Sequence, residues 1–162
     1  MCNFLHRDST SIPSAGVGYK IFSTRDGSAS AMGMEYHTQL GETLDGRVLH
    51  KWDDSLPWAK GNGFCFMLDR DHAFDVAREW SIGECWRKVY LYEIEYFHGL
   101  GQHQENNMFA HFSVQMALCR EFIIGSLVRV YRGGENVPPD NFQAVESTQQ
   151  TIGAPIRLAR RY

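Results

Sequence analysis

A chain of 162 residues with 43% hydrophobic residues has the length of one ordinary domain and can bury a core without disulfides. Its formal charge of −3 and its 22% of charged residues exclude a disordered acidic chain and a basic nucleic-acid-binding domain. We therefore expect one domain over residues 1–162, with an irregular lead-in over residues 1–17 and a loop-rich tail over residues 134–162.

The amino-terminal sequence and the cysteine pattern predict a cytoplasmic protein. Residues 1–8 contain charges and lack an apolar core of signal-peptide length, and no apolar run approaches the roughly 18 residues of a transmembrane helix. No membrane or nucleic-acid partner is expected. Four cysteines without Cys-x-x-Cys spacing are predicted to be reduced thiols: Cys2, Cys65, Cys85 and Cys119.

Short strands are predicted in the first part of the chain. The sequence "GYKIFS", which starts at Gly18, favours a first strand. Two more strands are expected over residues 31–36 and 47–52, with the turn-forming sequence "QLGETLDG" between them. Residues 53–63 are then predicted to form a loop.

The best-defined stretch is "GNGFCFMLDRDHAFDVAREW", Gly61 to Trp80. Its first part is apolar on both faces from Phe64 to Leu68, which predicts a central strand. Asp69 is expected to cap a helix, and "IGE" is expected to end it. The apolar stripe of this helix, which should lie on the sheet, consists of Ala73, Val76, Ala77 and Trp80.

The second half of the chain alternates in the manner of long strands. Residues 87–97, "RKVYLYEIEYF", predict a strand with one aromatic face. Residues 107–119 fit a helix or a strand, and we prefer a strand for their second half. "REFII", "GS" and "LVRVYR" predict two strands joined by a tight turn. The expected fold is α+β: a mostly antiparallel, twisted sheet of about six strands with one main covering helix.

Two motifs carry a first resemblance. "GYKIF" and "GFCFMLDRDHAFDVA", within residues 16–132, resemble a group of small uncharacterised phage and prophage proteins. The resemblance implies an accessory protein that needs no cofactor and binds a host macromolecule, such as a component of a defence or metabolic system. Trp52 and Trp58, which flank "DDSLP", are the expected exposed interface anchors. Burial of both in the core is the alternative.

The order of elements also resembles the mono-ADP-ribosyltransferase fold. On this resemblance "REFIIGSLVRVY" supplies the catalytic residue, Glu121, whose carboxylate would stabilise the oxocarbenium-like transition state as nicotinamide leaves NAD. The structural alternative is an ion pair of this carboxylate with Arg120 or Arg129 at a strand edge.

The same resemblance implies a site for NAD. Tyr19 or Lys20 stands where the family has the Arg or His that grips the dinucleotide, and Tyr19 would contribute to catalysis. "FCF" replaces the family's Ser-Thr-Ser or Tyr position, so Phe64 and Phe66 would line the cofactor.

A histidine-rich stretch is the remaining candidate. "HGLGQHQE" brings His98, His103 and Glu105 into one predicted glycine loop, and His111 lies nearby. Imidazole and carboxylate groups are suitable zinc or iron ligands. Because their spacing matches no metal signature, we predict a solvated loop without metal.

Overall fold

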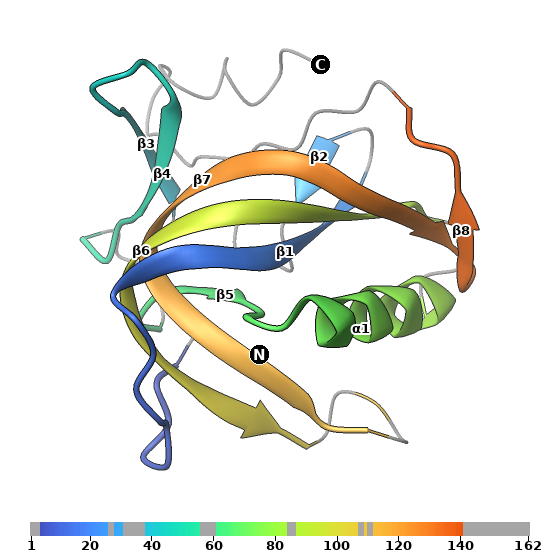
Figure 1. The fold of residues 1–162 in the computed structure, drawn as a ribbon, viewed down its shortest axis with the longest axis horizontal. Coiled ribbons are helices and arrows are strands. Elements are labelled where there is room, and N and C mark those ends of the chain that lie inside the picture. The colour runs from blue at the N-terminus through green and yellow to red at the C-terminus, as the bar shows by residue number, and fades with distance from the viewer. Residues whose placement is uncertain are drawn as a thin grey trace.

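In the computed structural model, the described residues are 4–25, 28–30, 38–55, 61–83, 87–106, 109 and 112–140. They form one eight-stranded antiparallel sheet and the helix α1 (Arg70–Gly83), so the predicted α+β class is confirmed (Figure 1). Among these residues, no helix is long and apolar enough to cross a membrane. The strands are β1 (Ala15–Arg25), β2 (Ser28–Ser30), β3 (Thr38–Glu42), β4 (Val48–Trp52), β5 (Phe64–Phe66), β6 (Val89–Glu105), β7 (Val114–Arg132) and β8 (Glu135–Val137).

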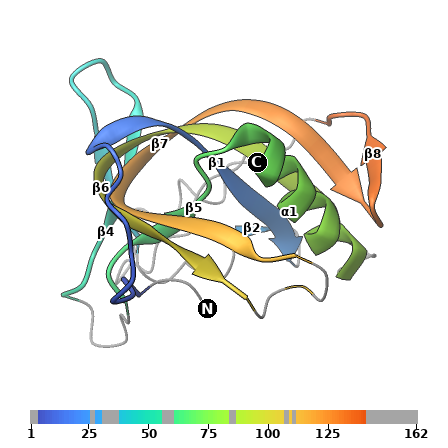
Figure 2. The ribbon, with the colours of Figure 1, turned by 60° about the horizontal axis from the view of Figure 1, so that its bottom comes forward.

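The two longest strands form the centre of the sheet. Its order is β2-β1-β6-β7-β4-β3, with β5 and β8 also paired to β7. Both β6 and β7 bend strongly along their length (Figures 1 and 2). Just after β5, Met67 exchanges two backbone hydrogen bonds of 2.8 Å with Tyr19 of β1. The strands β1, β6, β7 and β5 therefore form a closed ring.

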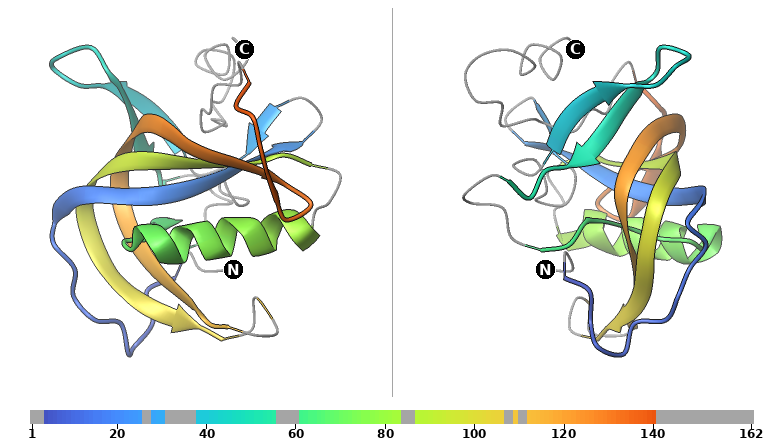
Figure 3. Two further views of the ribbon diagram at one scale, coloured as in Figure 1. Left: turned by 45° about the vertical axis from the view of Figure 1, so that its right-hand side comes forward. Right: turned by 90° about the vertical axis from the view of Figure 1, so that its left-hand side faces the viewer.

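The predicted central strand and covering helix are both confirmed. The side chains of Phe64 to Met67 have no exposed surface, because β5 lies between β7 and β1. The helix begins directly after Asp69, whose carbonyl accepts the amide hydrogen of Ala73 at 2.9 Å. It packs on β7, β6 and β1 through a buried stripe that consists of Ala73, Val76, Ala77 and Ser81 (Figure 3).

The predicted turn at Gly125 and Ser126 is wrong, because β7 runs through both residues without interruption. A Cβ atom at Gly125 would lie 2.8 Å from the carbonyl oxygen of Glu93 on β6. The register of β6 and β7 shifts at this level, between Tyr92 and Ile94. The glycine therefore allows a close backbone approach at an irregular pairing, rather than a reversal of the chain.

The predicted glycine loop over residues 98–105 is also wrong, because these residues continue β6. A Cβ atom at Gly99 would lie 2.4 Å from the carbonyl oxygen of Pro13, so this glycine permits close contact with the amino-terminal segment. Gly99 donates its amide hydrogen to Ser14 at 2.9 Å, and Thr10 pairs with Gln102. Thr10 and Ser14, which belong to the expected irregular lead-in, are therefore hydrogen-bonded to β6.

The sequence around the first hairpin was only partly interpreted correctly. The predicted strand over residues 47–52 is present as β4, but four of the five residues of its partner β3 lie within the stretch predicted as a turn. The predicted strand over residues 31–36 lies outside the described residues. The single short element expected after Gly133 corresponds to β8.

Candidate functional site

The two predicted catalytic residues, Glu121 and Tyr19, lie in different parts of the sheet. Glu121 on β7 is paired with Phe97 of β6, and its carboxylate lies 3.7 Å from the Nε2 atom of His98. Tyr19 on β1 is paired with Glu93 of β6. Phe97 and Glu93 are four positions apart on β6, which corresponds to about 13 Å along the strand. The structure does not bring the two side chains into one site.

The expected structural alternative for Glu121 is not found either. Arg120 donates instead to Asp54 at 3.1 Å, and the guanidinium of Arg129 lies 4.2 Å from the centre of the Phe74 ring. Within the described ranges, neither arginine forms an ion pair with Glu121. The Glu121 carboxylate is therefore a partly exposed acid with a histidine neighbour.

The three residues predicted to contact a cofactor are core residues. Lys20, Phe64 and Phe66 have no exposed surface. The ammonium of Lys20 donates to the carbonyl oxygen of Cys65 at 2.7 Å and lies 5.8 Å from the centre of the Phe64 ring. Phe66 packs against the ring of Tyr96 at 4.6 Å. These contacts bring Lys20 and Phe64 together, but in an interior that no dinucleotide reaches in this conformation.

Two further titratable groups share this interior with Lys20. The ring of His50 stacks on Phe122, with 4.8 Å between the ring centres. Burial, assisted by the nearby Lys20 ammonium, lowers the pKa of His50 to about 3, while a hydrogen bond with the Phe122 backbone opposes this shift. Burial raises the pKa of the Cys119 thiol. At neutral pH the interior therefore contains a neutral imidazole and an un-ionised thiol.

Trp52, predicted as an exposed interface anchor, is a core side chain. Its exposed fraction is 6%, and its indole packs edge-on against Phe64 with 5.2 Å between ring centres. The expected exposure of Trp52 is thus corrected, and the alternative of core packing holds for it. Trp58 lies outside the described residues.

The β3–β4 hairpin projects from the body of the protein and presents Leu44, which is fully exposed at its tip (Figures 1 and 3). The turn is held by several contacts. Arg47 donates its amide hydrogen to the Thr43 hydroxyl at 2.9 Å, and the Thr43 hydroxyl bonds to the Asp45 carboxylate. Gly46 has a φ of 84°, which glycine adopts without strain, and it donates to the Thr43 carbonyl at 3.0 Å. Leu44 is therefore carried on an ordered turn.

Arg47 connects this turn to the sheet. Its guanidinium lies 3.0 Å from the Asp45 carboxylate and 2.8 Å from Glu95 on β6. Hydrogen bonds from Thr43 and Arg47 lower the pKa of Asp45, and those to Glu95 and Asp45 raise the pKa of Arg47. Exposed ion pairs contribute little to stability, and the pair with Glu95 joins the hairpin turn to β6.

A groove of about 420 Å³ lies beside the hairpin, over β1, β6 and β7. Val17, which is 53% exposed, and Ile123 lie on either side of Glu95 in neighbouring strands. Glu93 lines the same groove and forms no ion pair within the part of the chain that the structure describes. We refer to these residues together as the hairpin–groove surface: Leu44, Arg47, Val17, Glu93 and Glu95.

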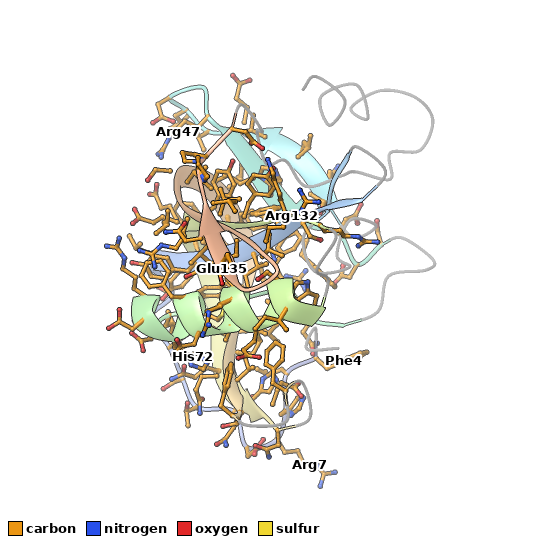
Figure 4. All side chains as sticks on the ribbon, turned by 90° about the vertical axis from the view of Figure 1, so that its right-hand side faces the viewer. Phe4, Arg7, Arg47, His72, Arg132 and Glu135 are labelled. Atoms are coloured by element: carbon orange, nitrogen blue, oxygen red, sulfur yellow. The ribbon has the colours of Figure 1, made fainter. Side chains whose placement is uncertain are left out.

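A second cavity, of about 500 Å³, lies against α1. Two of its polar groups already take part in the fold. The Nε2 atom of His72 accepts the amide hydrogen of Gln115 at 2.9 Å, and Arg78 donates to the carbonyl of Gly134 at 3.0 Å. Figure 4 shows His72 on α1, well away from Arg47. We therefore consider the hairpin–groove surface the better candidate site.

The histidine-rich stretch is divided by the structure. His103 and Glu105 are hydrogen-bonded at 2.9 Å, whereas His98 lies beside Glu121. A third histidine, His6, lies 3.5 Å from Glu105. His111 lies outside the described residues. The contribution of His6 was not predicted, because nothing in the local sequence connects it with β6.

The turn before β4 was predicted from the sequence, but it was not identified as a candidate site. A signal was present, since Leu44 stands between Thr43 and Asp45 in an otherwise polar turn sequence. No family model, curated protein or solved structure matches the chain. We therefore infer its function from the geometry of the described residues.

Proposed function

We propose that this chain is a small cytoplasmic binding protein that acts on a host protein through the hairpin–groove surface. The observation that carries the proposal is a fully exposed leucine, Leu44, on a turn fixed by Thr43, Asp45 and Arg47. An apolar side chain removes its surface from water only when a partner covers it. A turn that is already ordered loses little freedom on binding, which favours affinity.

The chemistry of the surface indicates the kind of partner. Leu44 and Val17 offer two exposed apolar contacts, while Glu93 offers a negative charge without an ion-pair partner among the described residues. A protein segment with an apolar side chain and a neighbouring lysine or arginine complements both features. The resemblance of "GYKIF" and "GFCFMLDRDHAFDVA" to phage proteins supports a bacterial protein as the partner.

The test compares two variants with the same chemical change. Leu44→Lys places a charge at the hairpin tip, and Ile82→Lys places it at a 46% exposed position on α1. Tagged wild-type protein and both variants are incubated with bacterial lysate, and the captured partner is then purified and titrated. We expect Leu44→Lys to bind at least about 30-fold more weakly, the loss of an interface hot spot, and Ile82→Lys to bind like the wild type.

All three proteins must give the same far-ultraviolet circular dichroism, so that a difference in binding reports the surface and not the fold. Equal affinity of the two variants would contradict the role of the hairpin. Failure of the wild type to capture any stoichiometric partner would contradict the binding function.

The enzymatic alternative, an ADP-ribosyltransferase-like activity that uses NAD, is tested with the same lysate. The binding function predicts that labelled NAD gives no labelled protein. Label that appears with the wild type and with Glu135→Gln, but not with Glu121→Gln, would overturn a binding-only function. Glu135 serves as the control because it is an exposed carboxylate on β8, outside the hairpin–groove surface.

A further inference from the structure

Three side chains of the metal-ligand type meet at the end of β6. His103 and Glu105 are two residues apart on this strand and so share one face, and His6 approaches them from the amino-terminal segment. The Oε1 atom of Glu105 lies 2.9 Å from Nε2 of His103 and 3.5 Å from Nε2 of His6. One potential ligand atom from each residue lies within 4.8 Å of the others. We propose that His6, His103 and Glu105 form a binding site for a zinc-type divalent cation.

The amino-terminal segment is held in place next to this site. Thr10 and Gln102 exchange two backbone hydrogen bonds, of 2.8 and 2.9 Å. Leu5 donates its amide hydrogen to the side chain of Asn62 at 2.7 Å. Because these contacts flank His6 on both sides, its position beside β6 follows from the packing of the segment.

The spacing of the ligand atoms suits a tetrahedral cation. With metal–ligand bonds of about 2.0–2.2 Å, two ligands of such an ion lie roughly 3.3 Å apart. The two measured distances to Glu105, 2.9 and 3.5 Å, are on either side of this value. The rings of His6 and His103 are stacked, with 3.8 Å between their centres, so the half-exposed ring of His6 must rotate to direct its nitrogen at the ion.

The ligand set determines which cations fit. Two imidazoles and one carboxylate suit zinc and its borderline neighbours such as cobalt, whereas magnesium and calcium prefer oxygen ligands. Three protein ligands leave one tetrahedral position for water. A bound ion would also fasten the amino-terminal segment to β6, since its ligands come from both.

The affinity should be moderate. When Nε2 of His103 binds a metal, the ring proton resides on Nδ1, and metal-bound histidines usually donate this proton to an acceptor. Here Nδ1 of His103 is buried without a hydrogen-bond partner among the described residues. A missing acceptor of this kind costs about 10- to 100-fold in affinity, so zinc should bind more weakly by this factor than at a site whose histidine has such an acceptor.

The experiment is a calorimetric titration of the full chain with zinc chloride. The variants are His6→Gln and Glu105→Gln, and the matched control is His98→Gln, a more exposed histidine on the same strand but outside the cluster. His103 is left intact, because it is buried and its replacement would also disturb the core. Cobalt serves as a spectroscopic probe, and circular dichroism confirms that each variant is folded.

We expect one equivalent of zinc to bind to the wild type and to His98→Gln with equal affinity, at least tenfold weaker binding to His6→Gln and to Glu105→Gln, and no binding of magnesium. Cobalt should give the visible spectrum of a low-coordinate ion with the wild type and with His98→Gln, but not with the two site variants. The proposal is overturned if no saturable binding occurs, if both site variants bind like the wild type, or if His98→Gln loses the ion. None of these outcomes depends on the hairpin–groove surface.

Discussion

The ring formed by β1, β5, β6 and β7 and the projecting β3–β4 hairpin differ in where they place reactive groups. The interior of the ring contains Lys20 and Cys119, together with His50 from β4; these residue types are common in active sites, yet all three are buried. The tip of the hairpin presents Leu44, which has no catalytic character but is fully exposed, and Arg47 joins this turn to Glu95 of β6. The comparison shows that the solvent exposure of a side chain, more than its residue type, distinguishes a candidate site from the core.

The strongest test of this contrast is the reactivity of the buried thiols. Cys65 and Cys119 are buried, and a raised pKa deprives Cys119 of the thiolate form that reacts. In a variant with Cys2 and Cys85 replaced by serine, we expect a disulfide reagent at pH 8 to react at least about 1000-fold more slowly with the native protein than with the urea-unfolded chain. Rapid reaction of the native protein would show that the interior is open to solvent.

A second test uses the pH dependence of stability. The folded pKa of His50 is about 3, against an ordinary value of 6.5, so the unfolded chain binds more protons between these limits. The contribution of His50 to stability is thus complete above pH 6.5 and is lost as the pH falls toward 3. Between pH 6.5 and 4.5 this loss should amount to about 2–3 kcal/mol in the free energy of unfolding.

The measurement is urea unfolding at both pH values, for the wild type, for His50→Gln and for the exposed control His98→Gln. Carboxylates contribute equally to all three proteins, so the difference between them isolates the histidine. We expect the wild type and His98→Gln to lose the same amount, and His50→Gln to lose less. Identical losses in all three would mean that His50 is hydrated in the folded protein.

A third test adds one methyl group to each region. A Cβ atom at Gly18 would lie 2.5 Å from a ring atom of Phe66, which is itself packed against Tyr96. At Gly41 in the hairpin the nearest atom, at 3.3 Å, belongs to the flexible side chain of Lys51. Gly18→Ala should therefore destabilise the protein by about 1–3 kcal/mol, and Gly41→Ala should leave it nearly unchanged.

The denaturation midpoints of these two variants, at unchanged slope, give the comparison directly. If Gly18→Ala is as stable as Gly41→Ala, the interior of the ring has room for an additional methyl group, and the close packing of β1 on Phe66 is wrong.

The parts of the fold that the sequence predicted are those governed by local periodicity. The strand that starts at Phe64 and the helix after Asp69 each show a characteristic pattern of apolar residues. Both elements lie where these patterns predict them. The glycines could not be interpreted in this way. Gly99 and Gly125 resemble turn residues, yet each serves a close contact with a backbone distant in the sequence.

The candidate sites were less predictable than the fold, for a related reason. Glu121 was placed on the correct kind of element, but its distance from Tyr19 depends on the register of three strands. Leu44 looked like an ordinary turn residue because exposure is decided by the whole fold. His6 had no local feature that marked it as a neighbour of Glu105.

The attachment of the β3–β4 hairpin has a consequence for how such a protein can vary. β4 pairs with β7 and carries the buried side chains of His50 and Trp52, whereas the turn over residues 43–47 contributes no buried side chain. Doubling the length of a flexible loop costs only about 0.6 kcal/mol in closure entropy. Evolution or engineering can therefore exchange this turn for another while β3, β4 and the ring are kept unchanged.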